Sequence, residues 1–279
     1  MDPEAKVTWR NFTGYFQLLT HHGIGMNVIH DVGAAQVREV VMGNADRDPT
    51  PQELDKMKAL VAQAMQQGAV GLSTALIYPP GNYAKTPEIV ALAQVAAQYH
   101  GIYLSHMRSE SGDLLKAIDE AISIGEQAHL PVHIYHLKAA GVENWHLIDP
   151  ALQKIQAARD SGLDVTADTY PYVYNGLNLG SFIPPEFYAA GRQKFYQSLA
   201  DPVVRQKLEA EIKTRTDFEN WYLHAGGIWN NVLITLAGGW TANIGKGTDA
   251  SEGGLPTRIP GPLARFHGFM RNMCVRTTY

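Results

Sequence analysis

Residues 101–138 read GIYLSHMRSESGDLLKAIDEAISIGEQAHLPVHIYHLK, and this stretch decides the fold. Short runs of strand-forming residues occur at 102–106 and again at 132–136. The apolar positions between them include Leu114, Ile118, Ala121, Ile122 and Gly125. Their i, i+4, i+7, i+8 spacing is typical of a helix that buries one face. Strand, helix and strand in this order predict a βαβ unit with two parallel strands.

The same pattern continues on both sides of this unit. Further strands are predicted at residues 26–32, 70–74 and 163–168, and further helices at 53–67, 88–100 and 151–161. A capping residue followed by proline marks two of the helix starts, Thr50-Pro51 and Thr86-Pro87. Gly68 and Gly162 follow helical segments, where a left-handed backbone favours glycine. This repeat indicates a parallel sheet.

Polar side chains at the predicted strand ends favour a barrel over an open, doubly wound sheet. They are Ser73, Thr74, His106, His136 and Asp168. In a barrel the strand ends converge on one mouth, so catalytic groups come from several strands. A doubly wound sheet usually carries a glycine-rich phosphate turn after its first strand, and the sequence has no such motif. We therefore predict an α/β fold, a (β/α) barrel of the TIM type.

The number of strands indicates that the barrel is incomplete. The sequence offers five strands and a weaker candidate at 232–235, whereas a TIM barrel has eight. Residues 9–22 look helical, and residues 238–279 are rich in Gly, Pro, Arg and Thr without a sustained period. We predict a partial barrel domain over residues 1–237 and an irregular or disordered tail over 238–279. Because open sheet edges tend to associate, a homo-oligomer is expected.

The composition excludes several classes of protein. The 279 residues include 23 Lys and Arg against 27 Asp and Glu, a net charge of -4, without a basic stripe, so a nucleic-acid partner is not expected. The single cysteine, Cys274, excludes an internal disulfide and a thiolate zinc cage. No apolar run approaches the ~20 residues of a membrane helix, and no secretory signal is recognisable. We expect a cytoplasmic protein with no membrane partner.

Two histidines stand at equivalent strand ends, His106 in the first run and His136 in the second. Histidine is the most common metal-ligating side chain, and two from neighbouring strands could hold one zinc ion. Each is followed two residues later by a cation, Arg108 or Lys138. The alternative is that each histidine is only a polar residue at the start of a loop.

Asp168 also ends a predicted strand. Its carboxylate could orient a ligating histidine, bind a metal or act as a base, or it could form the turn before Pro171. The simplest interpretation of Glu110 and Glu120 is that they are solvated helix residues. This interpretation fits Glu110 less well, because it sits in the polar loop beside His106 and Arg108.

Ser73 offers a separate route to hydrolysis. The segment Gly71-Leu-Ser-Thr-Ala75 resembles a nucleophile elbow whose last glycine is replaced by alanine. An elbow needs an immediate helix, and Leu76-Ile-Tyr-Pro-Pro-Gly81 cannot begin one promptly. A metal-free esterase that uses Ser73 with a nearby histidine is therefore the weaker alternative.

Four motifs follow one another in an order that is specific. They are GAVGLSTALIYPP at 68–80, YLSHMRSE at 103–110, HIYHLK at 133–138 and DTYPY at 168–172. Together they resemble the N-acyl-D-amino-acid deacylases, or D-aminoacylases, of the amidohydrolase superfamily, from about residue 9 to residue 234. The resemblance implies a metal-dependent barrel in which water activated by zinc hydrolyses the amide bond of an N-acyl-D-amino acid.

The resemblance also implies roles for individual residues. His106 and His136 match the metal-binding histidines of the family's middle strands. The residues assigned to the small acylated substrate are Tyr78, Arg108, Lys138 and Tyr170. A cation near the site suits the free carboxylate of such a substrate.

The chain departs from the family pattern at both ends. The family's first strand supplies a His-x-His pair, its second strand a cysteine ligand and its last strand an aspartate that serves as general base, and none has a counterpart here. Gly33-Ala34 stands where the family usually has Gly-His, and Asp249 has no strand before it. A truncated or frame-shifted coding sequence would explain both ends.

The sequence leaves three hypotheses open. The one we favour is a hydrolase of amide or related ester bonds, in which His106, His136 and Asp168 are catalytic and the two histidines hold zinc. The second is the metal-free esterase. The third is an inactive barrel fragment that serves as a scaffold.

Overall fold

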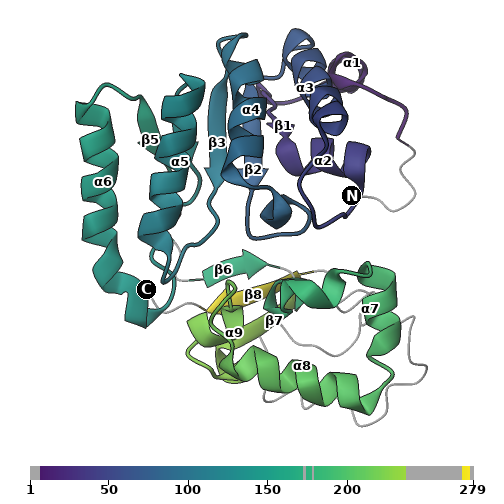
Figure 1. Ribbon diagram of the computed structural model, residues 1–279, viewed down its shortest axis with the longest axis vertical. Helices are drawn as coiled ribbons and strands as arrows, with labels where there is room; N and C mark the ends of the chain where they lie inside the picture. Colours follow the sequence, from purple (N-terminus) through teal and green to yellow (C-terminus); the bar gives the residue numbers. More distant parts are fainter. Residues whose placement is uncertain (1–6, 172–173, 178, 237–271, 277–279) are drawn as a thin grey trace.

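A five-stranded parallel sheet forms the larger part of the computed structural model, which describes residues 7–171, 174–177, 179–236 and 272–276. Its strands are β1 (Val32–Gly33), β2 (Gly71–Ala75), β3 (Ile102–His106), β4 (Val132–Ile134) and β5 (Val165–Ala167). They lie side by side in chain order, as in the wall of a barrel (Figure 1). The prediction of an α/β fold with these five parallel strands is confirmed, although only Val32 of the run at 26–32 is in β1.

Helices follow the strands and cover one face of this sheet (Figure 1). They are α2 (Ala34–Met42), α3 (Pro51–Gln66), α4 (Thr86–Ala97), α5 (Leu114–Ala128) and α6 (Ile148–Asp160), and α1 (Phe12–His22) precedes β1. Each of α2 to α5 packs on the next helix in the chain. The 3-10 helices η1 (Gly81–Tyr83) and η2 (Val142–Leu147) lie in the loops after β2 and β4.

The start of α3 illustrates how the sequence fixes these elements. The Thr50 hydroxyl accepts a hydrogen bond from the Glu53 N–H at 3.3 Å, and the Glu53 carboxylate accepts one from the Thr50 N–H at 2.8 Å. Pro51 takes the first helical position, where its missing N–H is not needed. This capping box starts the helix two residues before the predicted boundary at 53.

The main core lies between the helices and the sheet. Val132 and Ile134 are fully buried, whereas His133, which points to the opposite face, is half-buried. Gly125 lets α5 approach β4, since a Cβ at this position would lie 2.3 Å from Cγ2 of Val132. Glycine can occupy position 125 in the buried stripe because there is no room there for a side chain.

A second part of the chain has its own core and an antiparallel sheet of order β6-β8-β7. Its strands are β6 (Tyr174–Leu177), β7 (Val232–Leu236) and β8 (Asn272–Arg276). Its helices are η3 (Leu179–Phe182), η4 (Pro185–Tyr188), α7 (Arg192–Ser198), α8 (Pro202–Thr214), α9 (Trp221–His224) and η5 (Trp229–Asn231). The predicted strand at 232–235 thus exists as β7, but it pairs with β8 rather than with the parallel sheet.

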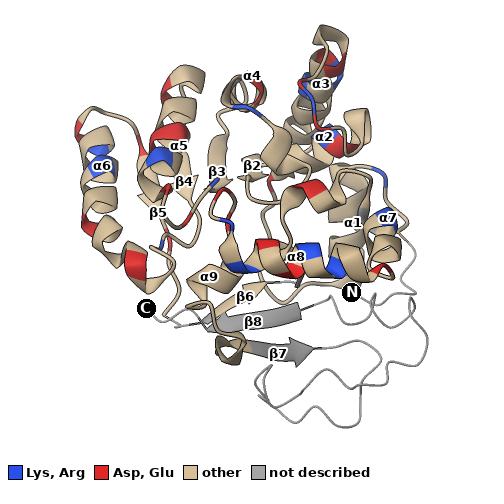
Figure 2. Cartoon of the chain, turned by 60° about the horizontal axis from the view of Figure 1, so that its bottom comes forward, with Lys and Arg blue, Asp and Glu red and all other residues tan. Residues whose placement is uncertain are grey.

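The boundary proposed at residue 237 stays a prediction. Residues 237–271, which include Asp249, lie outside the described residues, and the described part of the expected irregular tail is strand β8. Charges of both signs occur along α3, α6 and α8 (Figure 2). Within the described ranges, no helix is long and apolar enough to cross a membrane.

Candidate metal centre

The parallel pairing of β3 with β4 brings the two predicted histidines together. Ser105 is in register with Ile134, so the ends of the two strands lie at one edge of the sheet. His106 is the last residue of β3, whereas β4 ends at Ile134 and His136 follows in a left-handed conformation, with φ 39°. The expected continuation of β4 to residue 136 is wrong, because this backbone breaks the strand.

The two imidazole rings are in contact. Nδ1 of His106 lies 2.8 Å from Nε2 of His136, and the ring centroids are 4.5 Å apart at an interplanar angle of 76°. The side chains of His106 and His136 are 16% and 28% exposed, so both rings are largely buried and His136 is the more exposed.

Glu110 completes this group, and the expectation that it is solvated is wrong. Its side chain is only 2% exposed, and its Oε1 lies 2.8 Å from Nδ1 of His136 and 4.0 Å from Nε2 of His106. One possible ligand atom from each of the three residues lies within 4.8 Å of the ligand atoms of the other two. The position of Glu110, four residues after His106 in a polar loop, is a hint in the sequence, but a single acidic residue in a loop carries no periodic signal.

One buried atom of this group, Nε2 of His106, has no hydrogen-bond partner among the described residues. Oε1 of Glu110 lies 4.0 Å from it, which is beyond hydrogen-bond distance. A buried polar atom without a partner carries a desolvation cost. Two imidazoles and a carboxylate are also the donor set of one type of catalytic zinc site. The residues present therefore fit a zinc ion.

Lys138 neutralises this carboxylate. Its Nζ lies 2.8 Å from Oε1 of Glu110 and 2.8 Å from Nδ1 of His136, and its side chain is 5% exposed. The same ammonium lies 5.3 Å from the ring centroid of Tyr170, which is within cation–π distance. The structure thus brings Lys138 and Tyr170 together next to His136.

Burial and charge shift the titration of these groups. Burial lowers the pKa of His106 to about 4, an effect that Glu110 partly offsets. Burial opposes ionisation of Glu110, but His136, Lys138 and His106 together lower its pKa to about 2. His106 is therefore neutral and Glu110 ionised at pH 7, which are the forms that bind a metal.

Asp168 contacts the backbone of His136 instead of its ring. Oδ1 accepts a hydrogen bond from the His136 N–H at 2.5 Å, and Oδ2 lies 3.0 Å from Nε2 of His133. Burial works against its ionisation, but the contacts with His133 and His136 lower the pKa of Asp168 overall. This carboxylate supports the left-handed backbone of His136, and its predicted catalytic role stays a prediction.

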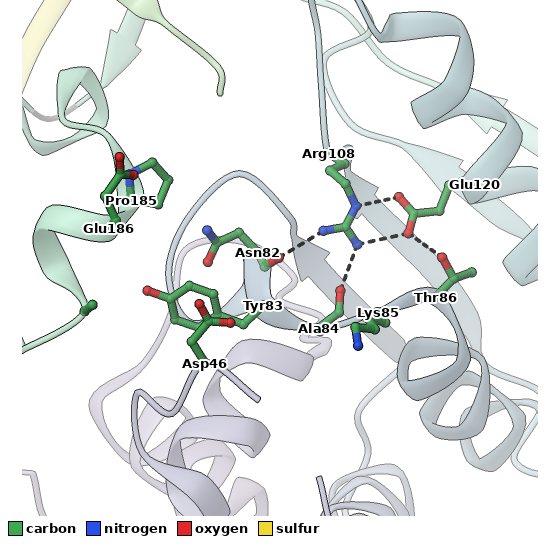
Figure 3. Close-up of a pocket in the computed structure, with 11 residues that line it drawn as sticks. Asp46, Asn82, Tyr83, Ala84, Lys85, Thr86, Arg108, Glu120, Pro185 and Glu186 are labelled. Carbon is green, nitrogen blue, oxygen red and sulfur yellow. Dashed lines mark hydrogen bonds and ion pairs between the residues drawn. The ribbon is translucent and has the colours of Figure 1, made fainter. Parts of the chain in front are cut away.

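Arg108 makes its hydrogen bonds with residues other than the two histidines. Its guanidinium donates to both carboxylate oxygens of Glu120 at 2.9 Å, and to the carbonyl oxygens of Asn82 at 3.1 Å and Ala84 at 2.9 Å (Figure 3). These residues line a cavity of about 570 Å³ together with Thr86, whose hydroxyl also bonds Glu120. Glu120 is thus an ion-pair partner and not a solvated residue, and the substrate contact of Arg108 stays a prediction.

Tyr78 lies closer to the centre. Its ring centroid is 5.4 Å from that of His106, and burial raises the pKa of Tyr78 to about 12. It lines a second cavity of about 620 Å³, whose wall includes Ile77, Ser111 and Trp221.

Ser73 lies within strand β2, opposite Leu104 of β3. Among the described residues, no histidine forms a hydrogen bond with its hydroxyl, so the structure offers no base that would activate it.

No family model matches this chain. Its sequence is 34% identical to D-aminoacylase of Alcaligenes xylosoxydans xylosoxydans over 173 residues, which are 62% of this chain and 36% of the relative. It is 35% identical to N-acyl-D-glutamate deacylase of the same organism over 158 residues, or 57% of this chain and 32% of the relative. The chain spans about a third of the length of these curated relatives.

Solved structures agree with the sequence matches. The crystal structure of N-acyl-D-glutamate deacylase from Bordetella bronchiseptica, complexed with zinc and a phosphonate inhibitor, is 32% identical with a TM-score of 0.59, covering 61% of this chain and 36% of that one. A D-aminoacylase structure is 29% identical with a TM-score of 0.59, over 71% of this chain and 45% of that one. The predicted resemblance is confirmed: the chain is homologous to part of the N-acyl-D-amino-acid deacylases.

Proposed function

We propose that this chain carries the metal-binding portion of an amidohydrolase that cleaves the amide bond of N-acyl-D-amino acids. The single observation that supports this most is the group of His106, Glu110 and His136, in which the buried Nε2 of His106 has no hydrogen-bond partner among the described residues. The homologous deacylases give the substrate class, and the zinc in the Bordetella bronchiseptica structure gives the metal.

In this proposal the three side chains hold one zinc ion. Such an ion lowers the pKa of a water molecule towards ~7 and polarises an acyl carbonyl. The ionised Glu110 would reduce the net charge of the loaded site, and the neutral imidazole of His106 would offer it a lone pair. Asp168 holds the His136 backbone so that this ring keeps its direction.

The remaining predicted residues would bind substrate. Lys138 and Tyr170 lie together next to His136, where an ammonium and a phenol could receive the free carboxylate of an acylated amino acid. The Tyr78 ring contacts His106 and borders the larger cavity, so it would limit the space for the acyl group. Arg108, which is hydrogen-bonded to Glu120, would contact the substrate from the wall of the cavity.

Hydrolysis of N-acetyl-D-amino acids tests the proposal. The zinc-loaded protein is expected to release acetate from D-substrates and not from the L-enantiomers, and removal of the metal by a chelator should abolish this activity until zinc is restored. Activity that persists without metal would contradict the proposal, and so would a zinc-loaded protein that cleaves no D-substrate.

We further propose that the chain self-associates through the edges of its parallel sheet and acts in the cytoplasm. Among the residues that the structure describes, strands β1 and β5 are the two edges of this sheet, and β1 pairs only with β2. Unpaired strand edges favour association with another chain. Sedimentation should therefore detect a homo-oligomer, and a monomer at all concentrations would contradict this.

A further inference from the structure

Glu219, from the second part of the chain, accepts hydrogen bonds from the loop that carries Glu110. Its side chain is 8% exposed. Its Oε1 accepts a hydrogen bond from the Glu110 N–H at 3.1 Å, and its Oε2 accepts one from the Ser111 hydroxyl at 3.2 Å. One carboxylate thus satisfies two donors of this loop, across a sequence separation of 109 residues.

His224 is the counterion of this carboxylate. Its Nε2 lies 3.5 Å from Oε1 of Glu219, its Nδ1 lies 3.8 Å from Oε1 of Glu143, and its side chain is 9% exposed. Burial opposes protonation, but the contacts with Glu143 and Glu219 raise the pKa of His224 to about 9. The buried charge of Glu219 is therefore compensated, as a buried carboxylate requires.

The position of Glu219 is fixed by its neighbour. Asn220 is 1% exposed, and its Nδ2 donates to the carbonyl oxygens of Ile212 and Arg215, both at 2.8 Å. Its Oδ1 accepts from the Tyr222 N–H at 3.1 Å at the start of α9. The Asn220 side chain therefore stabilises the connection between α8 and α9. Glu219 lies in this connection and contacts the loop at 109–111 from there.

The Glu110 backbone is held on its other side as well. Its carbonyl oxygen accepts a hydrogen bond from the Ala140 N–H at 2.7 Å, and the Ala140 carbonyl in turn accepts one from Asn144 at 2.7 Å. Both backbone groups of Glu110 are therefore fixed, which leaves its side chain directed at the two histidines.

We infer that Glu219 is a positioning residue, which holds the Glu110 backbone so that the Glu110 carboxylate stands at metal-binding distance from His106 and His136. This inference rests on the proposed function, because it assigns Glu219 to the same metal centre. Partners that orient a metal ligand typically change metal affinity 10–100-fold when they are removed. Sequence patterns do not point to Glu219, since it lies in a polar turn far along the chain.

Cobalt(II) binding tests the inference without reference to catalysis. Dissociation constants from calorimetry and the visible absorption of bound cobalt are compared for the wild type, Glu219→Ala, Glu219→Gln and Glu110→Gln. Glu209→Gln is the matched control, since this carboxylate is exposed on α8 and pairs with Lys213. Glu219→Ala should raise the cobalt dissociation constant about 10–100-fold and alter the spectrum.

Glu219→Gln should fall between the wild type and Glu219→Ala, because its amide oxygen can still accept from the Glu110 N–H. It also provides the test if the alanine variant does not fold. Binding is measured at a temperature below the unfolding of each variant. If a folded Glu219 variant has the dissociation constant and the spectrum of the wild type, the inference is overturned and Glu219 is only a structural residue. A wild type that binds no cobalt would instead overturn the proposed function.

Discussion

Nδ1 of His106 and Nε2 of His136 are 2.8 Å apart, although the two residues are 30 positions apart in the chain. The parallel register of β3 and β4 produces this contact, since it aligns the ends of the two strands. The contact is also what the sequence predicts for two histidines that follow neighbouring parallel strands.

Replacement of Ser73 by alanine separates the metal hypothesis from the serine hypothesis. Because no described histidine is hydrogen-bonded to the Ser73 hydroxyl, we expect Ser73→Ala to leave the turnover of N-acyl-D-amino acids and of short aryl esters within about twofold of wild type. Steady-state kinetics on both substrates measure this. Loss of ester turnover in this variant alone would support the serine route.

The ion pair of Arg38 and Glu88 is expected to contribute strongly to stability. Nη1 and Oε2 are 2.5 Å apart, and the side chains are 1% and 5% exposed. Since Glu88→Gln would leave a buried guanidinium without its carboxylate, we expect a loss of about 3–5 kcal/mol in the free energy of unfolding.

The exposed pair of Lys85 and Asp48 provides the control, because its side chains are 69% and 60% exposed. Asp48→Asn should cost less than about 1 kcal/mol. Urea unfolding of both variants measures the difference, and equal losses would show that burial does not govern these pairs.

Gly125→Ala tests the packing of α5 on β4. The added Cβ would lie 2.3 Å from Cγ2 of Val132, so the helix or the strand must shift. We expect a cost of about 1–3 kcal/mol from overpacking. Gly112→Ala is the control, because its Cβ would meet only Oδ1 of Asn144 at 3.9 Å. A thermal scan in which Gly125→Ala unfolds at or above the wild-type temperature would refute this account of the core.

His224 makes stability depend on pH in the alkaline range. Its pKa rises from 6.5 to about 9 on folding, so its contribution is fully present below pH 6.5 and is lost as the pH rises through 9. For a shift of this size the loss is on the order of 3 kcal/mol. His224→Gln removes the titration, and the difference in unfolding free energy between wild type and variant should shrink between pH 6 and 10. A difference that stays constant over this range would contradict the assignment.

Much of the fold could be predicted because helices and strands leave periodic signals. The capping box at Thr50 and the apolar stripe of α5 each specify a local structure, and the strands at 102–106 and 163–168 were placed by the same means. The run at 232–235 was also recognised as a strand. A strand-forming run does not encode its partner, however, so the sequence could not indicate that β7 pairs with β8.

The candidate site was predictable only where a metal-ligating side chain comes at a strand end or just after it. His106 ends β3 and His136 follows β4 by two residues, whereas Glu110 lies in a loop and reaches the histidines through tertiary contacts. The family resemblance implies a substrate contact for Arg108, but its guanidinium donates to Glu120, which is 12 residues away on α5. Which side chain pairs with which depends on how the helices and strands pack together, and this packing cannot be predicted from the local pattern of one sequence.

Zinc binding tests the central claim most directly. Equilibrium dialysis of the purified chain, with zinc measured by elemental analysis, is expected to give about one bound zinc per chain, and His106→Ala and His136→Ala should each lose most of it, because a catalytic zinc uses about three protein ligands. His100→Ala, at an unrelated loop, should bind as the wild type does. A wild type that binds no zinc, or a variant lacking both His106 and His136 that binds as much as the wild type, would contradict the account.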